Sequence, residues 1–443
     1  MQLMDQVLDL ATIPSAELPA CALTLARFSL FDWMACGLAG QREPLAEKLR
    51  NFALSEGGRP VASVIGGEGA PARMAAMVNG STSHALDYDD THFAHVGHLS
   101  VAIYPAALAV AEELDATAGD LIAAFLVGAE AAIRIGKVLG KAHYNLGFHQ
   151  TATAGAFGAT VAAGRLYSLD REQMRVALGL CSTRASGLKS QFGTMGKPYN
   201  AGIAASNGVE CAALARHGFS SVDDGLSGPQ GFVVTHTPES GEVEPMNGFL
   251  FEQNKYKLHA CCHGTHAMIE ALAGVKAQGA VDPDAVERIK LRTNPRWLRV
   301  CDIKVPRTGL EVKFSYAWLA GMTLRGDGTG DDRTYSDALA ADLGLAAFAR
   351  RVEVIGDDAV TDLQAIGQVE LKDGTVIAMS YDLADPVAED VLGRRLREKA
   401  KAMIGAEGDA LWGLADGLDH LPARAIGARL AFSATELLHV DSR

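Results

Sequence analysis

Residues 368–381 read QVELKDGTVIAMSY, and this stretch decides how the second half of the chain folds. Two strand-like runs flank Asp373–Gly374. An Asp-Gly pair between such runs is a strong short-range signal for a β-hairpin, because the tight turn needs residues that accept positive φ angles. The stretch therefore predicts two antiparallel strands in a chain that otherwise shows mostly helical patterns.

More strands surround this hairpin. Residues 286–292 (VERIKLR) alternate apolar and polar side chains, which is typical of a half-buried strand, and residues 352–355 form another candidate. Helical patterns lie between them, at 310–324 and 335–350. Strands and helices in this order predict an α+β domain of ordinary size.

The rest of the chain has helical texture. Thr117 with Asp120 three residues later predicts a helix start, since a Thr cap and an acid in the first turn satisfy exposed amides. Residues 387–404 and 411–418 return to helix after the hairpin. The predicted fold class is mainly α with a second α+β domain: an all-helical domain from 1–265 with 388–443, and a smaller domain from 266–387 inserted into it. The helices expected before residue 260 span 22–34, 70–85, 101–114, 121–139, 151–166, 170–181 and 201–217.

Composition excludes several classes of protein. The 443 residues are 48% hydrophobic, too apolar for a disordered chain, and carry a formal net charge of −13. An acidic chain is a poor partner for nucleic acid or for an anionic membrane. The uncharged run 142–164 is long enough to span a bilayer, but its His, Asn, Gln and Thr residues favour a buried helix instead.

The N-terminal residues and the cysteines predict a cytoplasmic protein. The N-terminal residues lack the basic and apolar regions of a signal peptide. The seven cysteines are odd in number and scattered, as expected for reduced thiols. Cys261 and Cys262 stand near His263 and His266, but no second ligand cluster accompanies them, so we expect no zinc site there.

Nine of the thirteen histidines fall in three short windows, and histidine is the side chain best suited to proton transfer at neutral pH. The first window runs from residue 79 to residue 98 and contains Asp87, Asp89 and Asp90. Three roles are open for these clustered acids. They raise the proton affinity of one carboxylate for catalysis, they bind Mg²⁺ or Ca²⁺, or they cap helices and pair with arginine. On spacing alone, catalytic and structural roles are equally supported.

Three other features bring candidate ligand groups. His149 precedes a helix of small residues, where unpaired amides suit an anion, although a capping or core role is commoner for a single histidine. Lys197 follows two glycines at a helix start, without the spacing of a nucleotide-binding loop. Lys255, Lys257 and His259 stand at the predicted domain boundary, and clefts between domains are preferred ligand sites. These groups predict a locally positive interdomain cleft inside an acidic protein.

Four segments in order resemble the motifs of one family: NGSTSHALDYDDTH (79–92), GFHQTATAGAFGAT (147–160), GTMGKPYNAG (193–202) and TGLEVKFS (308–315). The chain is thereby similar to the MmgE/PrpD family, which includes 2-methylcitrate dehydratase, cis-aconitate decarboxylase and iminodisuccinate epimerase. The resemblance covers about residues 20–400. It implies a large helical domain with a smaller α+β lid domain, a homodimer, and no metal or organic cofactor.

The resemblance also implies site residues, position by position. The catalytic candidates are Asp87, His98, His149, Lys197 and Tyr144, and the substrate-binding candidates are Thr91, Lys255 and His259. Two departures from the family pattern stand out. Trp318 occupies the position where dehydratase and decarboxylase members usually have Tyr, with Tyr316 as a possible substitute, and Asn200 stands where the family often has His.

The implied function is a cofactor-independent, 2-methylcitrate dehydratase-like lyase that moves a proton beside a carboxylate of a small di- or tricarboxylate. The alternatives are a cis-aconitate-type decarboxylase and an epimerase of an iminodisuccinate-like dicarboxylate. In the epimerase, Tyr144 opposite Lys197 would return the proton. From other classes, a catalytically inactive carboxylate-binding homologue stays open, and a metal-dependent hydrolase using Asp87, Asp90 and His98 is the weakest choice.

Overall fold

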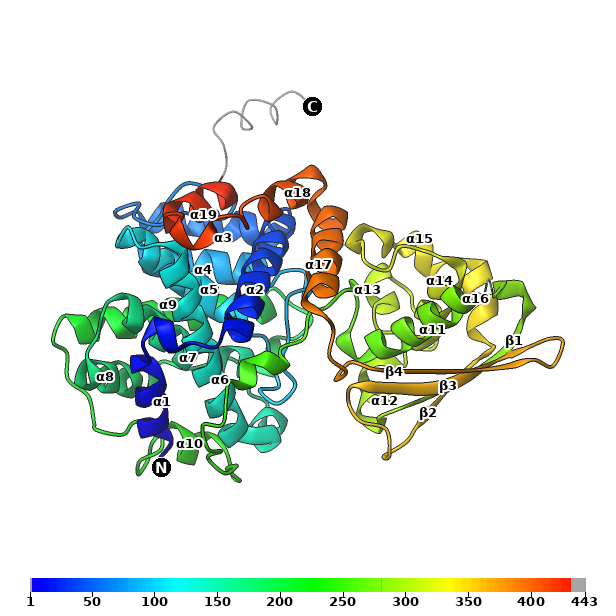
Figure 1. The fold of residues 1–443 in the computed structure, drawn as a ribbon, viewed down its shortest axis with the longest axis horizontal. Helices are drawn as coiled ribbons and strands as arrows, with labels where there is room; N and C mark the ends of the chain where they lie inside the picture. The colour runs from blue at the N-terminus through cyan, green and yellow to red at the C-terminus, as the bar shows by residue number, and fades with distance from the viewer. Residues whose placement is uncertain (1, 280, 432–443) are drawn as a thin grey trace. The chain divides into compact units, whose positions relative to one another are not determined.

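The computed structural model describes residues 2–279 and 281–431. The chain divides into two compact units, which Figure 1 shows coloured along the sequence. The large unit contains residues up to Tyr256 and the described residues from Ile404 onward, and the small unit runs from Lys257 to Met403. A mainly helical chain with an inserted α+β region is therefore confirmed.

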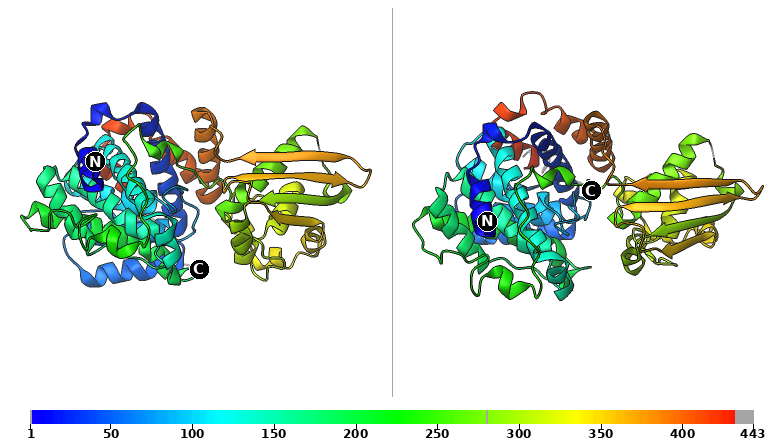
Figure 2. Two further views of the ribbon diagram at one scale, coloured as in Figure 1. Left: turned by 90° about the horizontal axis from the view of Figure 1, so that it is seen from below. Right: turned by 60° about the horizontal axis from the view of Figure 1, so that its bottom comes forward.

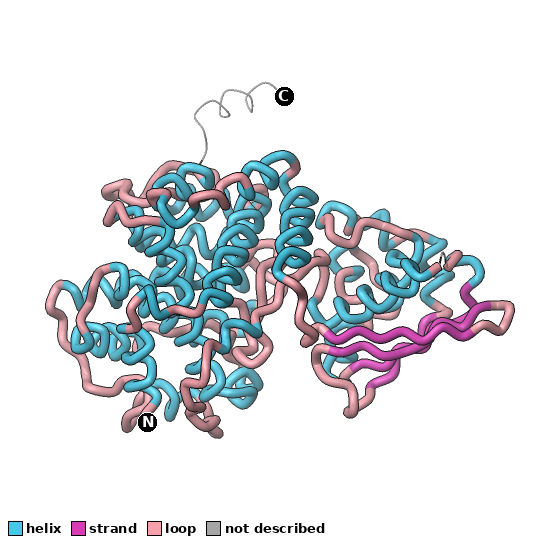
Figure 3. Tube along the Cα trace, viewed as in Figure 1, coloured by secondary structure: helices cyan, strands magenta, loops and turns pink. Residues whose placement is uncertain are grey.

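The large unit is built from helices, as the sequence predicts, and Figure 3 shows no strand among its described residues. Its helices are α1 (Leu3–Thr12), α2 (Ala20–Gly40), α3 (Pro44–Glu56), α4 (Ala72–Ser83), α5 (Ser100–Glu113), α6 (Ala118–Leu146), α7 (Gln150–Leu166), α8 (Arg171–Ser182), α9 (Gly196–Arg216), α10 (Phe232–His236), α18 (Ala406–Trp412) and α19 (Ala423–Leu430).

Small residues allow the central helices α4, α5, α7 and α9 to pack closely. A Cβ atom added at Gly80 of α4 would lie 3.0 Å from the Cα of Gly202 in α9 and 2.9 Å from the carbonyl oxygen of Val101 in α5. Such contacts are too short for any larger side chain. The close approach of α4 and α9 brings the residues that follow α4 beside the residues that begin α9.

Local signals explain how α6 begins and where it bends. Thr117 and Asp120 form the predicted capping box, in which each side chain accepts a hydrogen bond from the other residue's backbone amide. The helix is interrupted at Gly140, whose φ of +66° is outside the helical range and is open to glycine. The last turn of α6, with His143 and Tyr144, therefore leaves the axis of the preceding turns.

The small unit contains a four-stranded sheet in the order β2-β1-β3-β4. Strands β1 and β2 are parallel, and the other pairs are antiparallel, with β3 and β4 joined through Asp373–Gly374 as predicted (Figure 2). Register places Ile289 opposite Val369, and both are fully buried. The strands are β1 (Val286–Thr293), β2 (Val352–Gly356), β3 (Gln364–Leu371) and β4 (Val376–Asp382).

Helices accompany this sheet: α11 packs on β3 and β4, and α14 on β2. The helices of the small unit are α11 (His266–Gln278), α12 (Pro295–Cys301), α13 (Gly309–Val312), α14 (Tyr316–Arg325), α15 (Asp337–Ala340), α16 (Leu343–Ala349) and α17 (Glu389–Ile404).

Two details differ from the expected organisation. The single helices expected at 310–324 and 335–350 are each broken into two, and Ser315 caps the second piece of the first pair by accepting from the Trp318 amide. The small unit also extends beyond 266–387 at both ends. One reason is the ion pair between Glu270 of α11 and Arg395, which holds α17 to this unit.

One described helix, α2, is long and apolar enough to cross a membrane by length and composition. Two-thirds of that stretch is buried within the protein, as in core helices of ordinary globular domains. It is therefore weak evidence for a membrane span, and the cytoplasmic location stays a prediction.

Candidate functional site

Two imidazoles share one buried carboxylate just after α4. Nδ1 of His84 donates to Oδ1 of Asp89 at 2.8 Å, and Oδ2 of Asp89 lies 2.7 Å from Nδ1 of His98. The ring centroids of the two histidines are 4.6 Å apart. Because each oxygen of Asp89 faces one imidazole, this carboxylate orients both rings.

Asp87 and Lys197 complete the cluster. The Lys197 ammonium lies 2.7 Å from Oδ2 of Asp87, while Oδ1 of Asp87 lies 3.3 Å from Nε2 of His98. Asp87 has a φ of +52°, a left-handed conformation that Asp tolerates better than most residues. Lys197 stands in the first turn of α9, where the helix dipole adds positive potential. The site therefore holds a carboxylate between an ammonium and an imidazole.

His149 lies beside this cluster, at the N-cap of α7. Its ring centroid is 6.1 Å from that of His84, and Phe192 meets it edge-on at 5.0 Å. Nδ2 of Asn200 lies 3.2 Å from Nδ1 of His149 and 3.2 Å from the carbonyl oxygen of Leu188. His149 is thus fixed on one side by an amide and on another by an aromatic ring.

Burial controls the charges of the cluster. Burial lowers the pKa of His84 to about 4, although Asp89 opposes the change. Burial, followed by the nearby His84 and Lys197, holds the pKa of His149 well below its usual range. Burial alone would raise the pKa of Asp89, but the two imidazoles outweigh it and hold that pKa well below the usual value. At neutral pH, His84 and His149 are uncharged and Asp89 is ionised.

Asp90, the neighbour of Asp89, has a different environment. Its fully buried carboxylate accepts from the amide and hydroxyl of Ser100, at 3.1 and 2.7 Å, and from Nδ2 of Asn254 at 2.8 Å. Burial raises the pKa of Asp90, and the Ser100 donors partly offset this. The Ser29 hydroxyl also donates to Asp90, at 3.3 Å, so this residue connects four segments of the large unit and serves the fold rather than the cluster.

This connection places the predicted substrate-binding pair. Thr91 follows Asp90, Lys255 follows Asn254, and the two residues exchange backbone hydrogen bonds of 2.7 and 2.8 Å. Lys255 is thereby held opposite Thr91, which follows Asp87 by four residues in the chain. Its role in binding substrate stays a prediction.

His143 and Tyr144, close to His149 in sequence, lie in two different environments. His143 is buried, with Nδ1 contacting the His236 carbonyl at 2.7 Å and Nε2 contacting the Thr153 hydroxyl at 2.9 Å, so it is a satisfied core residue. Tyr144 lies under Lys189, whose ammonium is 3.6 Å from the ring centroid and donates to the Tyr144 carbonyl. The predicted position of Tyr144 opposite Lys197 stays a prediction.

His259 belongs to the small unit. Nδ1 of this residue contacts the Thr329 hydroxyl at 2.8 Å, and Nε2 contacts Glu270 at 3.0 Å. Both ring nitrogens therefore already have partners, and a substrate carboxylate would have to replace one of them. Lys257, close by in sequence, is buried although lysine is normally exposed.

Tyr316 and Trp318, at the point where the chain departs from the family pattern, are both buried in the small unit. The Tyr316 hydroxyl donates to the Gly264 carbonyl at 2.8 Å and lies 3.1 Å from the Thr293 hydroxyl. Trp318 donates from its indole nitrogen to the Leu339 carbonyl at 3.3 Å. Both side chains therefore stabilise the interior of this unit.

One group among the described residues has the composition of a cation site. His84, Asp87, Asp89 and His98 each bring one nitrogen or carboxylate oxygen within 4.8 Å of the others. The Lys197 ammonium on Asp87 opposes a second positive charge there. A cation bound there would have to displace the Lys197 ammonium from Asp87. Asp90, proposed with Asp87 and His98 for a metal-dependent hydrolase, has its carboxylate bound by Ser100 and Asn254 instead.

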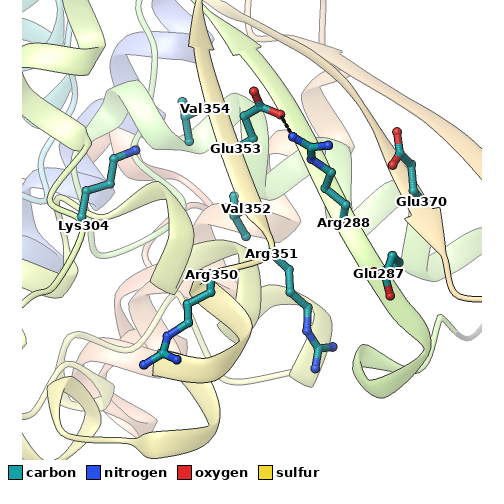
Figure 4. A pocket seen from close by; sticks show the side chains of 9 residues that line it. All are labelled: Glu287, Arg288, Lys304, Arg350, Arg351, Val352, Glu353, Val354 and Glu370. Carbon is teal, nitrogen blue, oxygen red and sulfur yellow. Dashed lines mark hydrogen bonds and ion pairs between the residues drawn. The ribbon is translucent and has the colours of Figure 1, made fainter.

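A surface hollow of about 820 Å³ lies on the small unit (Figure 4). Arg288 pairs there with Glu353 at 2.6 Å, and Arg351 donates to the Val286 carbonyl at 2.9 Å. It contains no histidine, so it lacks the proton-transfer groups of the large unit. Its lining residues are Glu287, Arg288, Lys304, Arg350, Arg351, Val352, Glu353, Val354 and Glu370.

The structure thus brings Asp87, His98 and Lys197 into direct contact, with His149 beside them, while the catalytic roles themselves stay predictions. The sequence pattern selects neither His84 nor Asp89 as a site residue, although both lie in the first window. Alternating acids gave no signal of which one faces a histidine. Asn200 stands out in the sequence only as a departure from the family pattern.

Two models of one protein family match the two parts of the chain. The MmgE/PrpD N-terminal domain model matches residues 10–242, and the MmgE/PrpD C-terminal domain model matches residues 259–408. Cis-aconitate decarboxylase of Aspergillus terreus is 31% identical over 288 residues, which cover 60% of this chain and 59% of that protein. Cis-aconitate decarboxylase of Homo sapiens is 31% identical over 237 residues, which cover 50% and 49%. The chain therefore matches less than two-thirds of the length of these relatives.

Proposed function

This chain belongs to the MmgE/PrpD family, and we propose that it is a lyase that acts on a small di- or tricarboxylate by moving a proton beside a carboxylate, without a cofactor. The observation that carries the proposal is the Asp87 carboxylate, 2.7 Å from the Lys197 ammonium and 3.3 Å from His98. This internal carboxylate occupies the environment that a substrate carboxylate would use.

The proposed reaction begins with exchange of carboxylates on Lys197. A substrate carboxylate replaces Asp87, and Lys255 and His259 are proposed to bind further carboxylates of the same substrate. Breaking a bond beside a carboxylate leaves an electron pair that spreads into the carboxylate as an enolate, which nearby cations and donors stabilise. His98, oriented by Asp89, is the proposed carrier of the proton at carbon, and such a group contributes about a hundred- to ten-thousandfold in rate.

Two lyase reactions fit this chemistry. In dehydration, a base removes the proton at carbon and the hydroxyl departs with a proton as water. In decarboxylation, the C–C bond breaks, CO₂ departs, and a proton from the protein takes its place on carbon. The 31% identity to proteins named cis-aconitate decarboxylase favours decarboxylation of a related tricarboxylate as the second candidate beside dehydration.

The experiment that tests the proposal is NMR of a panel of di- and tricarboxylates incubated with the protein in deuterated water. A new alkene or released CO₂ identifies dehydration or decarboxylation. Deuterium entering a substrate carbon without net elimination identifies an epimerase. Binding of citrate-like ligands without any turnover would instead identify an inactive carboxylate-binding homologue and would refute the lyase.

Lys197→Ala tests the binding role within the same assay. We expect it to abolish turnover and leave the thermal unfolding midpoint nearly unchanged, since Lys197 and Asp87 are both partly exposed and such ion pairs contribute little to stability. Lys137→Ala is the matched control, because Lys137 also pairs with a carboxylate, that of Glu244 at 2.6 Å, outside the cluster. Equal rates for the two variants would remove Lys197 from the site.

On the family resemblance alone, we also propose that the protein works as a homodimer. Sedimentation velocity at micromolar concentration tests this, and a single species of 46.6 kDa would contradict it.

A further inference from the structure

The orientation of the Asn200 amide is determined by its surroundings. Its Nδ2 lies 3.2 Å from the carbonyl oxygen of Leu188, and a carbonyl can only accept a hydrogen bond. The group at that position must therefore be the amide NH₂. The same nitrogen lies 3.2 Å from Nδ1 of His149, so its second hydrogen points to that ring nitrogen. Nδ1 of His149 consequently accepts a hydrogen bond and carries no proton.

This arrangement determines where the proton of His149 lies. The residue is 3% exposed, and burial keeps its imidazole uncharged at neutral pH. A neutral imidazole carries one proton, on one of its two nitrogens. Since Nδ1 is the acceptor, the proton is on Nε2, and His149 presents a hydrogen-bond donor at its other end.

We propose that Asn200 holds His149 in the Nε2–H tautomer, so that His149 donates a hydrogen bond to a substrate oxygen and does not remove the proton from carbon. This inference rests on the proposed function and divides the work of the two histidines. His98, whose Nδ1 faces the Asp89 carboxylate, moves the proton. His149 stabilises the enolate that forms.

The placement of Asn200 on the helix supports this division. Asn200 stands three residues after Lys197, so the two side chains share one face at the start of α9. The same helical turn therefore supplies an ammonium for a carboxylate and sets the donor on the neighbouring imidazole. An uncharged donor aimed at the developing negative charge stabilises the transition state without a cost of reorganisation.

The first test needs no variant of Asn200 and no turnover. The protein is labelled with ¹⁵N at histidine, the His149 signals are assigned by their loss in His149→Gln, and the tautomer is read from long-range ¹H–¹⁵N correlations. We expect Nδ1 to resonate as an unprotonated nitrogen and Nε2 as a protonated one. A protonated Nδ1 in the neutral ring would overturn the inference, even in a protein that proves to be an active lyase.

Variants then connect the tautomer to the reaction. Asn200→Asp replaces the donor by an acceptor, which draws the proton to Nδ1, and we expect kcat to fall about a hundredfold, the typical effect of losing one such donor. Asn200→Ala removes the preference, so both tautomers should be visible and kcat should fall less. An unchanged kcat in Asn200→Asp with a reversed tautomer would overturn the role of His149 as the donor.

The matched control is Asn207→Asp. Asn207 is also buried on α9, and its Nδ2 also donates to a backbone carbonyl, that of Arg184 at 2.8 Å, but it does not touch an imidazole. We expect this control to lower stability as Asn200→Asp does, without changing the tautomer of His149. If both variants lower kcat equally with the His149 signals unchanged, the effect of Asn200 is structural and the inference fails. Absence of turnover in every variant and in the parent would refute the proposed function alone, because the tautomer is measured separately.

Discussion

Replacing Asp90 by Asn should separate the role of this acid from that of its neighbour Asp89. Asp90 is fully buried and accepts hydrogen bonds from the amide and hydroxyl of Ser100, from Asn254 and, at 3.3 Å, from the Ser29 hydroxyl. The variant keeps the shape of the side chain but turns one acceptor into a donor. At least one buried donor of Ser100 or Asn254 then faces another donor, which costs about 2–4 kcal/mol of unfolding free energy.

The same change should weaken substrate binding through the backbone. Asn254 precedes Lys255, and Lys255 is held against Thr91 by two backbone hydrogen bonds. Loss of the Asn254 contact with Asp90 loosens this pair, so we expect KM for a carboxylate substrate to rise more than kcat falls. The assays are equilibrium urea unfolding and steady-state kinetics on whichever substrate the NMR panel identifies.

A double variant sharpens the test. In Asp90→Asn with Asn254→Asp, the new amide at 90 can donate to the new carboxylate at 254, while its oxygen still accepts from Ser100. We expect the double variant to recover at least about 1 kcal/mol relative to the sum of the single changes, which is a coupling typical of direct neighbours.

The control is Asp170→Asn. Asp170 accepts from the Gln173 amide at 2.8 Å in an exposed helix cap, where Asn serves as well as Asp, so stability should change by a few tenths of a kcal/mol. If Asp90→Asn is no more costly than this control, or if the double variant shows no recovery, the assignment of Asp90 as a buried connector is wrong.

Three further outcomes are expected. Burial would raise the pKa of Glu270, but His259 and Arg395 outweigh it and lower that pKa to about 2. The ion pairs of Glu270 therefore contribute about 3 kcal/mol of stability, which is fully present above about pH 4.5 and is lost as pH falls toward 2. Urea unfolding of Glu270→Gln should lack this part of the pH dependence, and an unchanged dependence of stability on pH would contradict the assignment. Val96 has a φ of +56°, which is strained for a β-branched residue, so Val96→Gly should be more stable than Val96→Ala by about 1 kcal/mol in urea unfolding, the reverse of the order in a helix. Treatment with EDTA should leave turnover unchanged because Lys197 already neutralises Asp87, whereas inactivation followed by rescue with a divalent metal would show that the cluster binds a cation.

Much of the local structure followed from short-range patterns. The Asp373–Gly374 turn, the strands beside it and the capping box at Thr117 depend on interactions within a few residues, so each was predictable where it stands. The helices expected at 310–324 and 335–350 are each two helices, because residues within them, such as Ser315, cap the start of a new helix although the helical periodicity continues. The extent of the small unit could not be predicted, because the pair of Glu270 and Arg395 joins positions 125 residues apart.

By itself, the sequence determined the helical body, the inserted α+β region and the family, and it predicts the window in which the chemistry lies. Only the tertiary structure decided that Asp89 serves two imidazoles while Asp90 serves the fold, and that Asn200 faces His149. The physical reason is the close packing of the helices that small residues such as Gly80 and Gly202 permit. That packing brings residues 84–98, 149 and 197–200 together. The contacts and burial that result determine the protonation of each side chain, and no local pattern encodes them.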